Sequence, residues 1–225
     1  MTTDRRASQM ESQYARRPAA PPPRRARLPL WEERVNAIQS CLRPLEPLAE
    51  CTLLEVGAST GYNVPTWRQL GFREITLNDI RSAPLAEAAR WGVTTVGGDV
   101  ATLKMPPFNV IYAGLVFSSI LQDVDRRDVA NGLWRLTRVD GMIIIYDFTW
   151  NNPANRDVRK VTSSAIRRLF PAAIIQSCRL TLAPPIARRI PAWLYPFVNI
   201  AVLKSHRLWW LRKVQVAQDN IGDGK

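Results

Sequence analysis

The stretch Leu53–Asn63, which reads LLEVGASTGYN, holds the residues whose types and spacing most directly indicate chemistry. An apolar run containing Glu55 leads into a turn of small residues, with Ser59 between Gly57 and Gly61. Glycine lets a backbone approach a ligand closely and adopt conformations that other residues resist. Amides exposed where such a turn opens a helix bind anionic groups. This order of strand, turn and helix predicts the first crossover of a nucleotide-binding α/β domain.

Two acids follow at the ends of predicted strands. Asp79 closes the next predicted strand, 22 residues after Gly57, where a carboxylate can accept hydrogen bonds from both hydroxyls of a ribose. Asp99 stands in the sequence GGDV after the third predicted strand. Either acid alone is more often a cap or a turn residue. With the glycine turn, the interval to Asp79 favours a site for a cofactor that contains a ribose.

Two side chains are candidate general bases. Asp147 ends the fifth predicted strand, and His206, the single histidine, begins the last one. A carboxylate or an imidazole at the carboxyl edge of a sheet can take a proton from a hydroxyl acceptor. Structural roles remain open for both, because Asp147 could cap the following loop and a lone histidine is often structural or exposed.

The polar segment Asn151–Val161 is a candidate substrate site. It follows a central strand, at the edge where ligands of open α/β sheets bind, and it carries Arg156, Arg159 and Lys160. Guanidinium groups pair with phosphate or carboxylate. We therefore expect Asn151, Arg156 and Arg159 to contact substrate, with a solvated loop as the alternative.

These residues require a scaffold in which strands and helices alternate. Strands are expected at 52–56, 74–78, 93–96, 109–115, 142–148, 173–181 and 206–213. Helices are expected within 30–48 and at 62–70, 84–91, 125–138 and 163–170. Gly71, Gly92 and Gly141 stand where helix C-caps belong. The near-continuous apolar strands favour a sheet that is buried on both faces.

Composition divides the chain of 225 residues into three parts. Residues 1–30 are rich in Pro, Ala and Arg and are expected to form a disordered basic arm, with a short capping helix around Ser12–Arg17 as the alternative. Residues 31–213 are expected to form one domain, in which 156–205 supply the substrate side, and residues 214–225 a polar tail.

Charge and cysteine content restrict the function classes. The net charge of +12 is distributed as +5 over residues 1–30, −3 over 31–155 and +10 over 156–225, which favours an anionic substrate or surface or simply a solvated basic surface. Three scattered cysteines and one histidine form no metal-ligand spacing and no disulfide framework, so we expect no metal and a cytoplasmic protein. No apolar run approaches the ~20 residues that span a bilayer.

Over about residues 30–213 the chain resembles the class I S-adenosylmethionine-dependent methyltransferases. Glu55–Gly61 is similar to their first motif, with Ser59 in place of the middle glycine, and Leu133–Phe148 is similar to their helix, glycine turn and strand. The resemblance implies a Rossmann-like, doubly wound α/β sheet of seven strands, mostly parallel with an antiparallel last strand, and helices on both faces. It implies S-adenosyl-L-methionine as cofactor, bound by residues of the turn and of three strand ends: Glu55, Gly57, Ser59, Gly61, Asn63, Asp79, Ile80, Asp99, Val100 and Gly114.

The segments after Val116 are similar to small bacterial methyltransferases, which implies O-methylation of a small molecule or of a glycan-like or glycolipid-like acceptor. Two alternatives remain: an RNA methyltransferase, suggested by the basic charge and Trp209–Trp210, and a non-catalytic module that binds the cofactor or a partner. Arg188, Arg189 and the aromatic stretch Ala192–Leu203 could place the protein peripherally at a membrane. A dehydrogenase is disfavoured because the turn does not spell GxGxxG.

Overall fold

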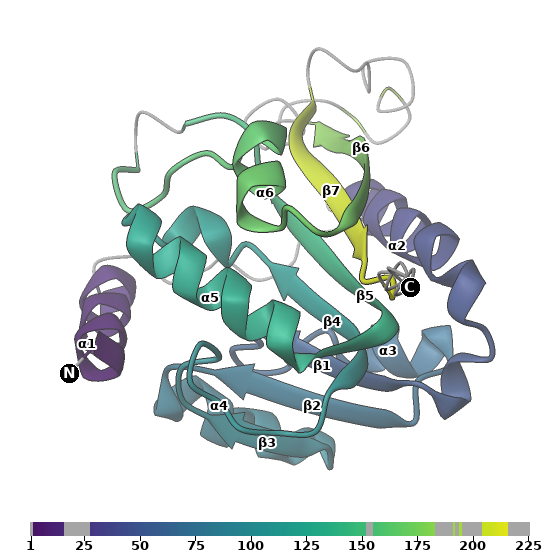
Figure 1. The fold of residues 1–225 in the computed structure, drawn as a ribbon, viewed down its shortest axis with the longest axis horizontal. Coiled ribbons are helices and arrows are strands. Elements are labelled where there is room, and N and C mark those ends of the chain that lie inside the picture. The colour runs from purple at the N-terminus through teal and green to yellow at the C-terminus, as the bar shows by residue number, and fades with distance from the viewer. Residues whose placement is uncertain are drawn as a thin grey trace, which may run out of the picture.

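The predicted strands form one seven-stranded sheet in the order β3-β2-β1-β4-β5-β7-β6 (Figure 1). This computed structural model describes residues 2–15, 28–151, 155–182, 191, 194 and 204–215. The first five strands run parallel, and β7 pairs antiparallel with both β5 and β6, as expected. The strands are β1 Thr52–Val56, β2 Glu74–Asp79, β3 Thr94–Gly97, β4 Phe108–Gly114, β5 Thr137–Phe148, β6 Ile174–Leu182 and β7 Lys204–Arg212.

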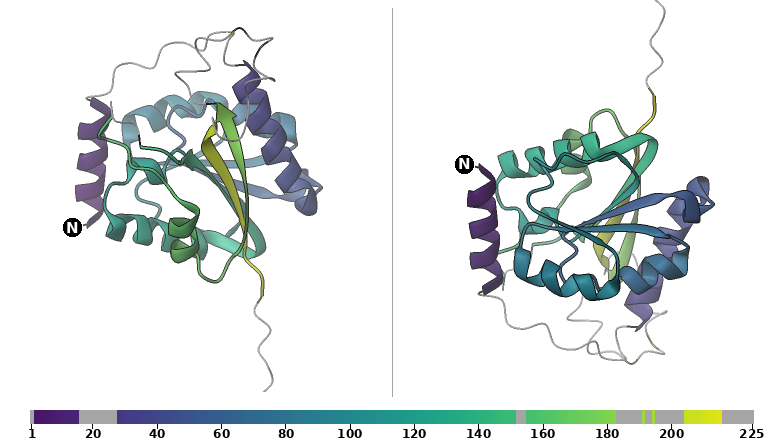
Figure 2. Two further views of the ribbon diagram at one scale, coloured as in Figure 1. Left: turned by 90° about the horizontal axis from the view of Figure 1, so that it is seen from above. Right: turned by 90° about the horizontal axis from the view of Figure 1, so that it is seen from below.

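Helices cover both faces of the sheet (Figure 2). The α-helices are α1 Thr2–Ala15, α2 Leu28–Leu42, α3 Val64–Leu70, α4 Ser82–Ala88, α5 Asp123–Leu136 and α6 Ser163–Leu169. Residues of α2, α3 and α4 pack with one face of the sheet in one apolar core, and residues of α5 and α6 pack with the other face in a second core. Successive strand residues point to opposite faces, so Leu53 lies in the first core and Leu54 in the second.

The ends of the parallel strands meet at one edge of the sheet. Val56, the last residue of β1, pairs with Asn78 of β2 and with Ala113 of β4, and Asp79 pairs with Gly97. The strand order reverses between β1 and β4, which is the topological switch point where open α/β sheets bind ligands. The predicted glycine turn follows β1 and therefore lies at this point.

Two expectations are wrong. The arm expected to be disordered is helical over Thr2–Ala15, although residues 16–27 lie outside the described part of the chain. Gly141 is not a helix C-cap: α5 ends at Leu136, Thr137 follows it, and Gly141 lies within β5. Gly71 and Gly92 do cap their helices in the left-handed conformation, as predicted.

Several expectations fall outside the described residues. These include Arg188, Arg189, nearly all of the aromatic stretch 192–203 and most of the tail 214–225. Among the helices of the described ranges, none combines the length and the apolar character needed to cross a bilayer.

Candidate functional site

The glycine turn after β1 is tightly enclosed. Gly57, Ser59 and Gly61 all have positive φ, of 69°, 51° and 71°. A Cβ on Gly57 would lie 2.8 Å from Val116, which follows β4, and one on Gly61 would lie 2.8 Å from both Leu77 and Trp91. Both positions therefore require glycine for conformation and for space. The turn holds its backbone close to the end of β4, as a cradle for a ligand requires.

Asp79 ties the turn to the end of β2. One carboxylate oxygen accepts a hydrogen bond from the Ser59 amide at 2.8 Å and the other from the Arg81 amide at 2.9 Å. The side chain is buried, and each oxygen has a second lone pair that could accept from a ribose hydroxyl. Ile80, the next residue, is half-buried.

Asp99 carries an oxygen that lacks a hydrogen bond. Its Oδ1 accepts from the Ala101 amide at 3.0 Å. Its Oδ2 is buried and makes no hydrogen bond in the described part of the chain, while Val100 beside it is buried. A buried acceptor of this kind suits a ligand that donates a proton, such as an exocyclic amino group.

The Arg6 side chain reaches this oxygen from α1. Arg6 Nε lies 2.8 Å from Asp99 Oδ2, but the two atoms are not aligned as a hydrogen bond. The same guanidinium lies within ion-pair distance of Asp125 and Asp128 on α5, at 3.9 and 3.4 Å. The first helix therefore contacts the end of β3 and the start of α5 by charge.

Glu55 organises the start of the following helix. Its two oxygens accept from Asn63 Nδ2 and Trp67 Nε1, each at 2.6 Å. Burial raises the pKa of Glu55 to about 6, although the two hydrogen bonds and Arg34 oppose the shift. Because its two oxygens accept from Asn63 and Trp67, the structural role of Glu55 is to fix the conformation of the turn and of the helix that follows.

The guanidinium of Arg34, on α2, lies beside the residues that follow the glycine turn. Its guanidinium lies 4.4 Å from the centre of the Trp31 ring and 5.4 Å from that of Tyr146, and it donates to Asn63 Oδ1 at 3.3 Å. In the described ranges no carboxylate lies within ion-pair distance of it. An arginine between aromatic rings, without a carboxylate partner, suits an anionic ligand group.

A hydrogen-bonded row of polar side chains lies beneath Arg34. The Tyr146 hydroxyl lies 3.0 Å from Thr181 Oγ1, which lies 2.8 Å from His206 Nδ1. The His206 ring stacks on Tyr146 with centroids 5.0 Å apart, and Ser205 Oγ is also 3.0 Å from Nδ1. Burial, with a smaller effect of Arg34, lowers the pKa of His206 to about 4, so the imidazole is neutral at neutral pH.

Asp147 is fully buried beside this row. Its oxygens accept from the Ser118 amide and from the Phe148 amide, both at 2.9 Å. Burial raises its pKa to about 6 against these bonds and against the Arg126 charge. The Ser118 bond ties Asp147 to the loop after β4, whereas the cap role left open by the sequence concerned the loop that follows β5.

The side chains of the predicted substrate segment bond to neighbouring residues or are exposed. Asn151 Oδ1 accepts from the Lys160 amide at 2.8 Å, Arg159 pairs with Asp123, and Arg156 is exposed. Gly114, at the end of β4, lies where a Cβ would come within 2.7 Å of the Tyr112 hydroxyl. The cofactor candidates thus gather at one edge, whereas Asn151 and Arg159 bond within their own surface region.

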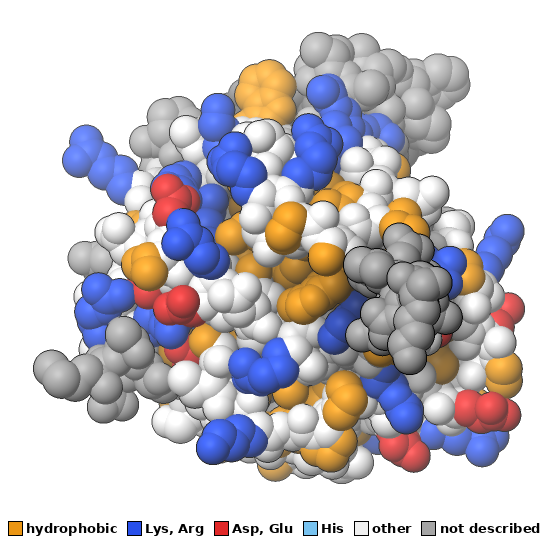
Figure 3. All heavy atoms as spheres, in the orientation of Figure 1, with side chains coloured by type: hydrophobic (Ala, Val, Ile, Leu, Met, Phe, Trp, Pro, Cys, Tyr) orange, Lys and Arg blue, Asp and Glu red, His pale blue; other side chains and the backbone are white. Residues whose placement is uncertain are grey.

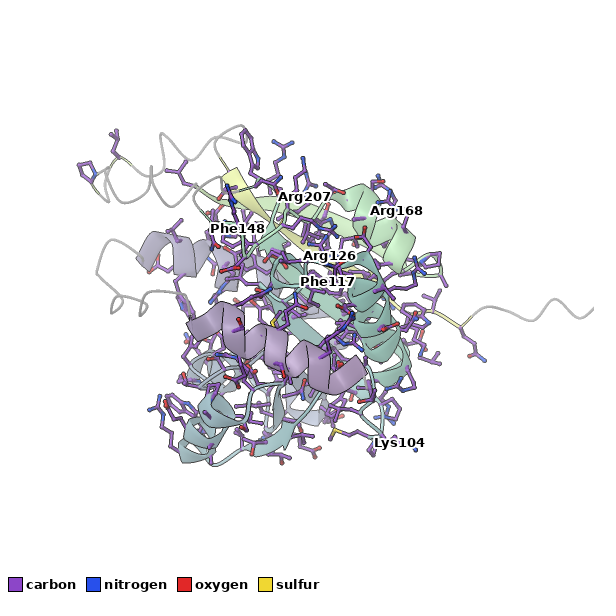
Figure 4. The ribbon with its side chains drawn as sticks, turned by 90° about the vertical axis from the view of Figure 1, so that its left-hand side faces the viewer. Lys104, Phe117, Arg126, Phe148, Arg168 and Arg207 are labelled. Carbon is purple, nitrogen blue, oxygen red and sulfur yellow. The ribbon has the colours of Figure 1, made fainter. Side chains whose placement is uncertain are left out.

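The basic surface lies mainly away from the glycine turn. Lys and Arg side chains are spread over the face that α5 and α6 cover (Figure 3), and Figure 4 shows Arg168 and Arg207 on its upper part. Trp209, which together with Trp210 suggested the RNA alternative, is fully buried and donates to Ser163, while Trp210 is half-buried and donates to Gln176. This placement weakens the aromatic argument for RNA.

Two cavities in the described part of the chain lie apart from the turn. One of about 210 Å³ lies between α5 and α6, and one of about 470 Å³ is lined by residues at the opposite ends of β1, β2 and β3. The described residues contain no group of three or more His, Cys, Asp or Glu that could hold a metal ion.

Comparison with solved structures identifies the fold. Magnesium protoporphyrin IX methyltransferase from Synechocystis PCC 6803 with bound SAM is similar at 13% identity and TM-score 0.61, over 94% of this chain and 95% of that one. A SAM-bound amino pentose methyltransferase from Micromonospora echinaspora is similar at 15% identity and TM-score 0.57, over 81% and 91%.

A putative sarcosine dimethylglycine methyltransferase from Galdieria sulphuraria is similar at 11% identity and TM-score 0.58, over 80% of this chain and 86% of that one. No family model and no curated protein sequence matches the chain. At these identities the likeness shows the fold alone: a Rossmann-like α/β fold that these solved methyltransferases share, which is the fold that the motifs predicted.

Three contributors were not expected from the sequence: Arg6, Arg34 and the Tyr146–Thr181 pair. A signal for Arg34 exists, because it lies three residues after Trp31 and thus on the helix face that also carries Val35 and Ile38. A charge on the face that a helix turns to the core indicates a buried partner or a ligand. Arg6 and Thr181 have no such local signal.

Proposed function

We propose that the protein is an S-adenosylmethionine-dependent methyltransferase that acts on a small acceptor carrying an anionic group. The observation that carries the proposal is the assembly at one switch point of the enclosed turn 57–61, the carboxylate of Asp79 and the buried Asp99 Oδ2, which Arg6 approaches without a hydrogen bond. The three features match the three parts of the cofactor: an amino acid, a ribose and an amino-bearing base.

The residues present fit that cofactor by their chemistry. The glycines leave backbone amides of the turn open to a carboxylate, and Asp79 offers lone pairs to a diol. Asp99 Oδ2 is a buried acceptor that needs a donor. Val100 and Ile80 would supply apolar contacts around the base. When bound, the cofactor supplies an activated methyl group, so the protein contributes mainly proximity and alignment.

Arg34 supports an anionic acceptor. Its guanidinium, set against the rings of Trp31 and Tyr146, can pair with a carboxylate or phosphate of the acceptor. Tyr146 of β5 pairs with Gly114, the last residue of β4, so an acceptor held by Arg34 would lie next to the switch point. Arg156 is a further candidate contact, from the exposed segment after β5.

We favour an oxygen of the acceptor as the atom that is methylated, because a row of hydrogen-bonding side chains could carry away its proton. Tyr146, Thr181 and His206 are joined by contacts of 3.0 and 2.8 Å, and the neutral imidazole at the end can accept a proton. An oxygen that is gaining a methyl group becomes strongly acidic, so a base as weak as His206, whose pKa is about 4, suffices once the new bond is forming. Asp147, by contrast, would position the loop after β4.

The proposed acceptor is a small molecule, and sugars and glycolipid head groups are the leading class. One structural neighbour acts on an amino pentose and another on a porphyrin, so this fold serves acceptors of very different shape. The charge of Arg34 beside Tyr146 favours an anionic compound.

Transfer of a labelled methyl group tests the proposal. The full chain is incubated with S-adenosylmethionine labelled on its methyl group and with fractionated cell extract, with Asp99→Asn as the matched variant. We expect label in a small-molecule fraction for the wild type and a loss of at least tenfold for the variant. Label in RNA would favour the nucleic-acid alternative, and absence of transfer together with absence of cofactor binding would refute the proposal.

A further inference from the structure

We propose that α1 is a latch over the nucleoside end of the candidate cofactor site, and that Arg6 competes with the cofactor for Asp99. The inference rests on the proposed function, because it takes S-adenosylmethionine as the ligand of Asp99. The new element is that α1 controls the entry of the ligand.

The position of α1 suits a latch. Figure 1 shows it beyond the ends of the parallel strands, at the edge where the glycine turn lies, and both views in Figure 2 keep it on that side. Figure 4 looks at this edge and shows α1 crossing in front of the body, with Phe117 and Arg126 above it. The helix thus lies on the outer side of this edge, against Asp99 and the start of α5.

Arg6 takes the place that a ligand donor needs. Its Nε lies 2.8 Å from Asp99 Oδ2, and both side chains are almost fully buried, at 7% and 2% exposed. A donor to Asp99 Oδ2 must come within about 2.9 Å of that oxygen, which is the distance at which Arg6 already lies. Asp99 Oδ1 already accepts from the Ala101 amide, so in the described part of the chain Oδ2 is the Asp99 oxygen without a hydrogen bond.

The contact is one that can be released. Arg6 Nε and Asp99 Oδ2 are close but make no hydrogen bond, so the pair lacks the aligned geometry that makes buried ion pairs strong. A ligand that donates along the lone pair of Asp99 Oδ2 would satisfy the oxygen better than Arg6 does. Opening of the helix would also release Arg6 from Asp125 and Asp128 on α5.

Apart from the contacts of Arg5 and Arg6 with α5, the helix is held weakly. Neither apolar core of the described residues contains a residue of α1. Gln13, two turns after Arg6 and buried like it, has an Oε1 without a hydrogen-bond partner in the described part of the chain. A helix that rests on a polar inner face gains little free energy from apolar burial, so it can detach without unfolding the sheet.

A latch that is mostly closed lowers the apparent affinity. If about 90% of molecules are closed, the apparent Kd for a ligand that needs the open form is about tenfold higher than the intrinsic Kd. Removing the Arg6 charge should therefore strengthen binding, which is the opposite of what loss of an ordinary binding residue does.

The test compares Arg6→Gln with Glu11→Gln by calorimetric titration with S-adenosylhomocysteine. Glu11 is the matched control because it is an exposed charged residue of the same helix, whereas Arg5 itself ties the helix to Asp125. We expect Arg6→Gln to bind about tenfold more tightly than the wild type and Glu11→Gln to change the Kd less than about twofold. Thermal unfolding without ligand checks that each variant is folded.

Hydrogen exchange gives a second readout that does not depend on a variant. In the wild type, saturating S-adenosylhomocysteine should speed amide exchange within 2–15 while slowing it in the turn 57–61. Equal or weaker binding by Arg6→Gln, or slower exchange in α1 with ligand, would overturn the latch while leaving the proposed function intact. Absence of binding by every protein would overturn both.

Discussion

The amide of Ser59 donates a hydrogen bond to the carboxylate of Asp79 at 2.8 Å. The bond joins the turn after β1 to the end of β2, so the residue in place of the usual middle glycine is held by the acid expected to bind a ribose. Ser59 has a φ of 51°, a conformation that costs a non-glycine residue free energy. The bond to Asp79 offsets part of that cost and fixes the turn before any ligand arrives.

The effect of crowding at Gly61 on stability can be separated from the effect of its positive φ by comparison with Gly92. Gly61→Ala places a Cβ 2.8 Å from Leu77 and Trp91, whereas Gly92→Ala meets nothing within 4 Å, and both positions have positive φ. We expect Gly92→Ala to lower the free energy of unfolding by about 1 kcal/mol and Gly61→Ala by about 2–4 kcal/mol. Denaturant unfolding measures both. Equal losses would mean that the turn is not tightly enclosed.

Arg34 should act on the acceptor rather than on the cofactor. For Arg34→Gln we expect transfer of labelled methyl to the acceptor fraction to fall by tenfold or more, while the Kd for S-adenosylhomocysteine changes less than about twofold. Arg43→Gln, on the exposed turn after α2, is the matched control for loss of one charge. A Kd that rises as much as the transfer rate falls would assign Arg34 to the carboxylate of the cofactor.

His206 should make stability depend on pH. Its pKa is lowered to about 4 by burial, below its ordinary value near 6.5, so the neutral form contributes stability above pH 6.5 that is lost as the pH falls through 4. Relative to His206→Gln, the wild type should lose unfolding free energy on the order of 3 kcal/mol between pH 7 and 4. Urea unfolding at several pH values measures this. A difference that is independent of pH would show that His206 titrates normally.

Asp147 should prove structural. Asp147→Asn leaves an amide facing one of the backbone donors Ser118 and Phe148, so we expect a loss of about 1–3 kcal/mol in unfolding free energy. Asp140→Asn is the control, because Asp140 is exposed and its positive φ of 60° suits asparagine equally well. If Asp147→Asn abolished methyl transfer while stability and cofactor affinity stayed unchanged, Asp147 would instead be the general base.

The sheet could be predicted because its signals are local. Apolar strands, the turn at Gly57 and Gly61 and the caps at Gly71 and Gly92 are each specified by neighbouring residues, and β1 has the predicted bounds. The helix α1 could not be predicted, because its sequence lacks an apolar face and its contacts with Asp99 and Asp125 join residues far apart in the chain. The partners of Asp147 and His206 are likewise set by packing, so the sequence could name these side chains but not their surroundings.

Calorimetric titration of the full chain with S-adenosylhomocysteine tests the cofactor site most directly, with Asp79→Ala beside the wild type and Glu87→Ala, an exposed acid on α4, as control. We predict one site per chain in the wild type and in Glu87→Ala, and an affinity at least tenfold lower in Asp79→Ala. An absence of heat with the wild type and with Arg6→Gln, or binding by Asp79→Ala as tight as that of the wild type, would contradict a cofactor site at the turn after β1.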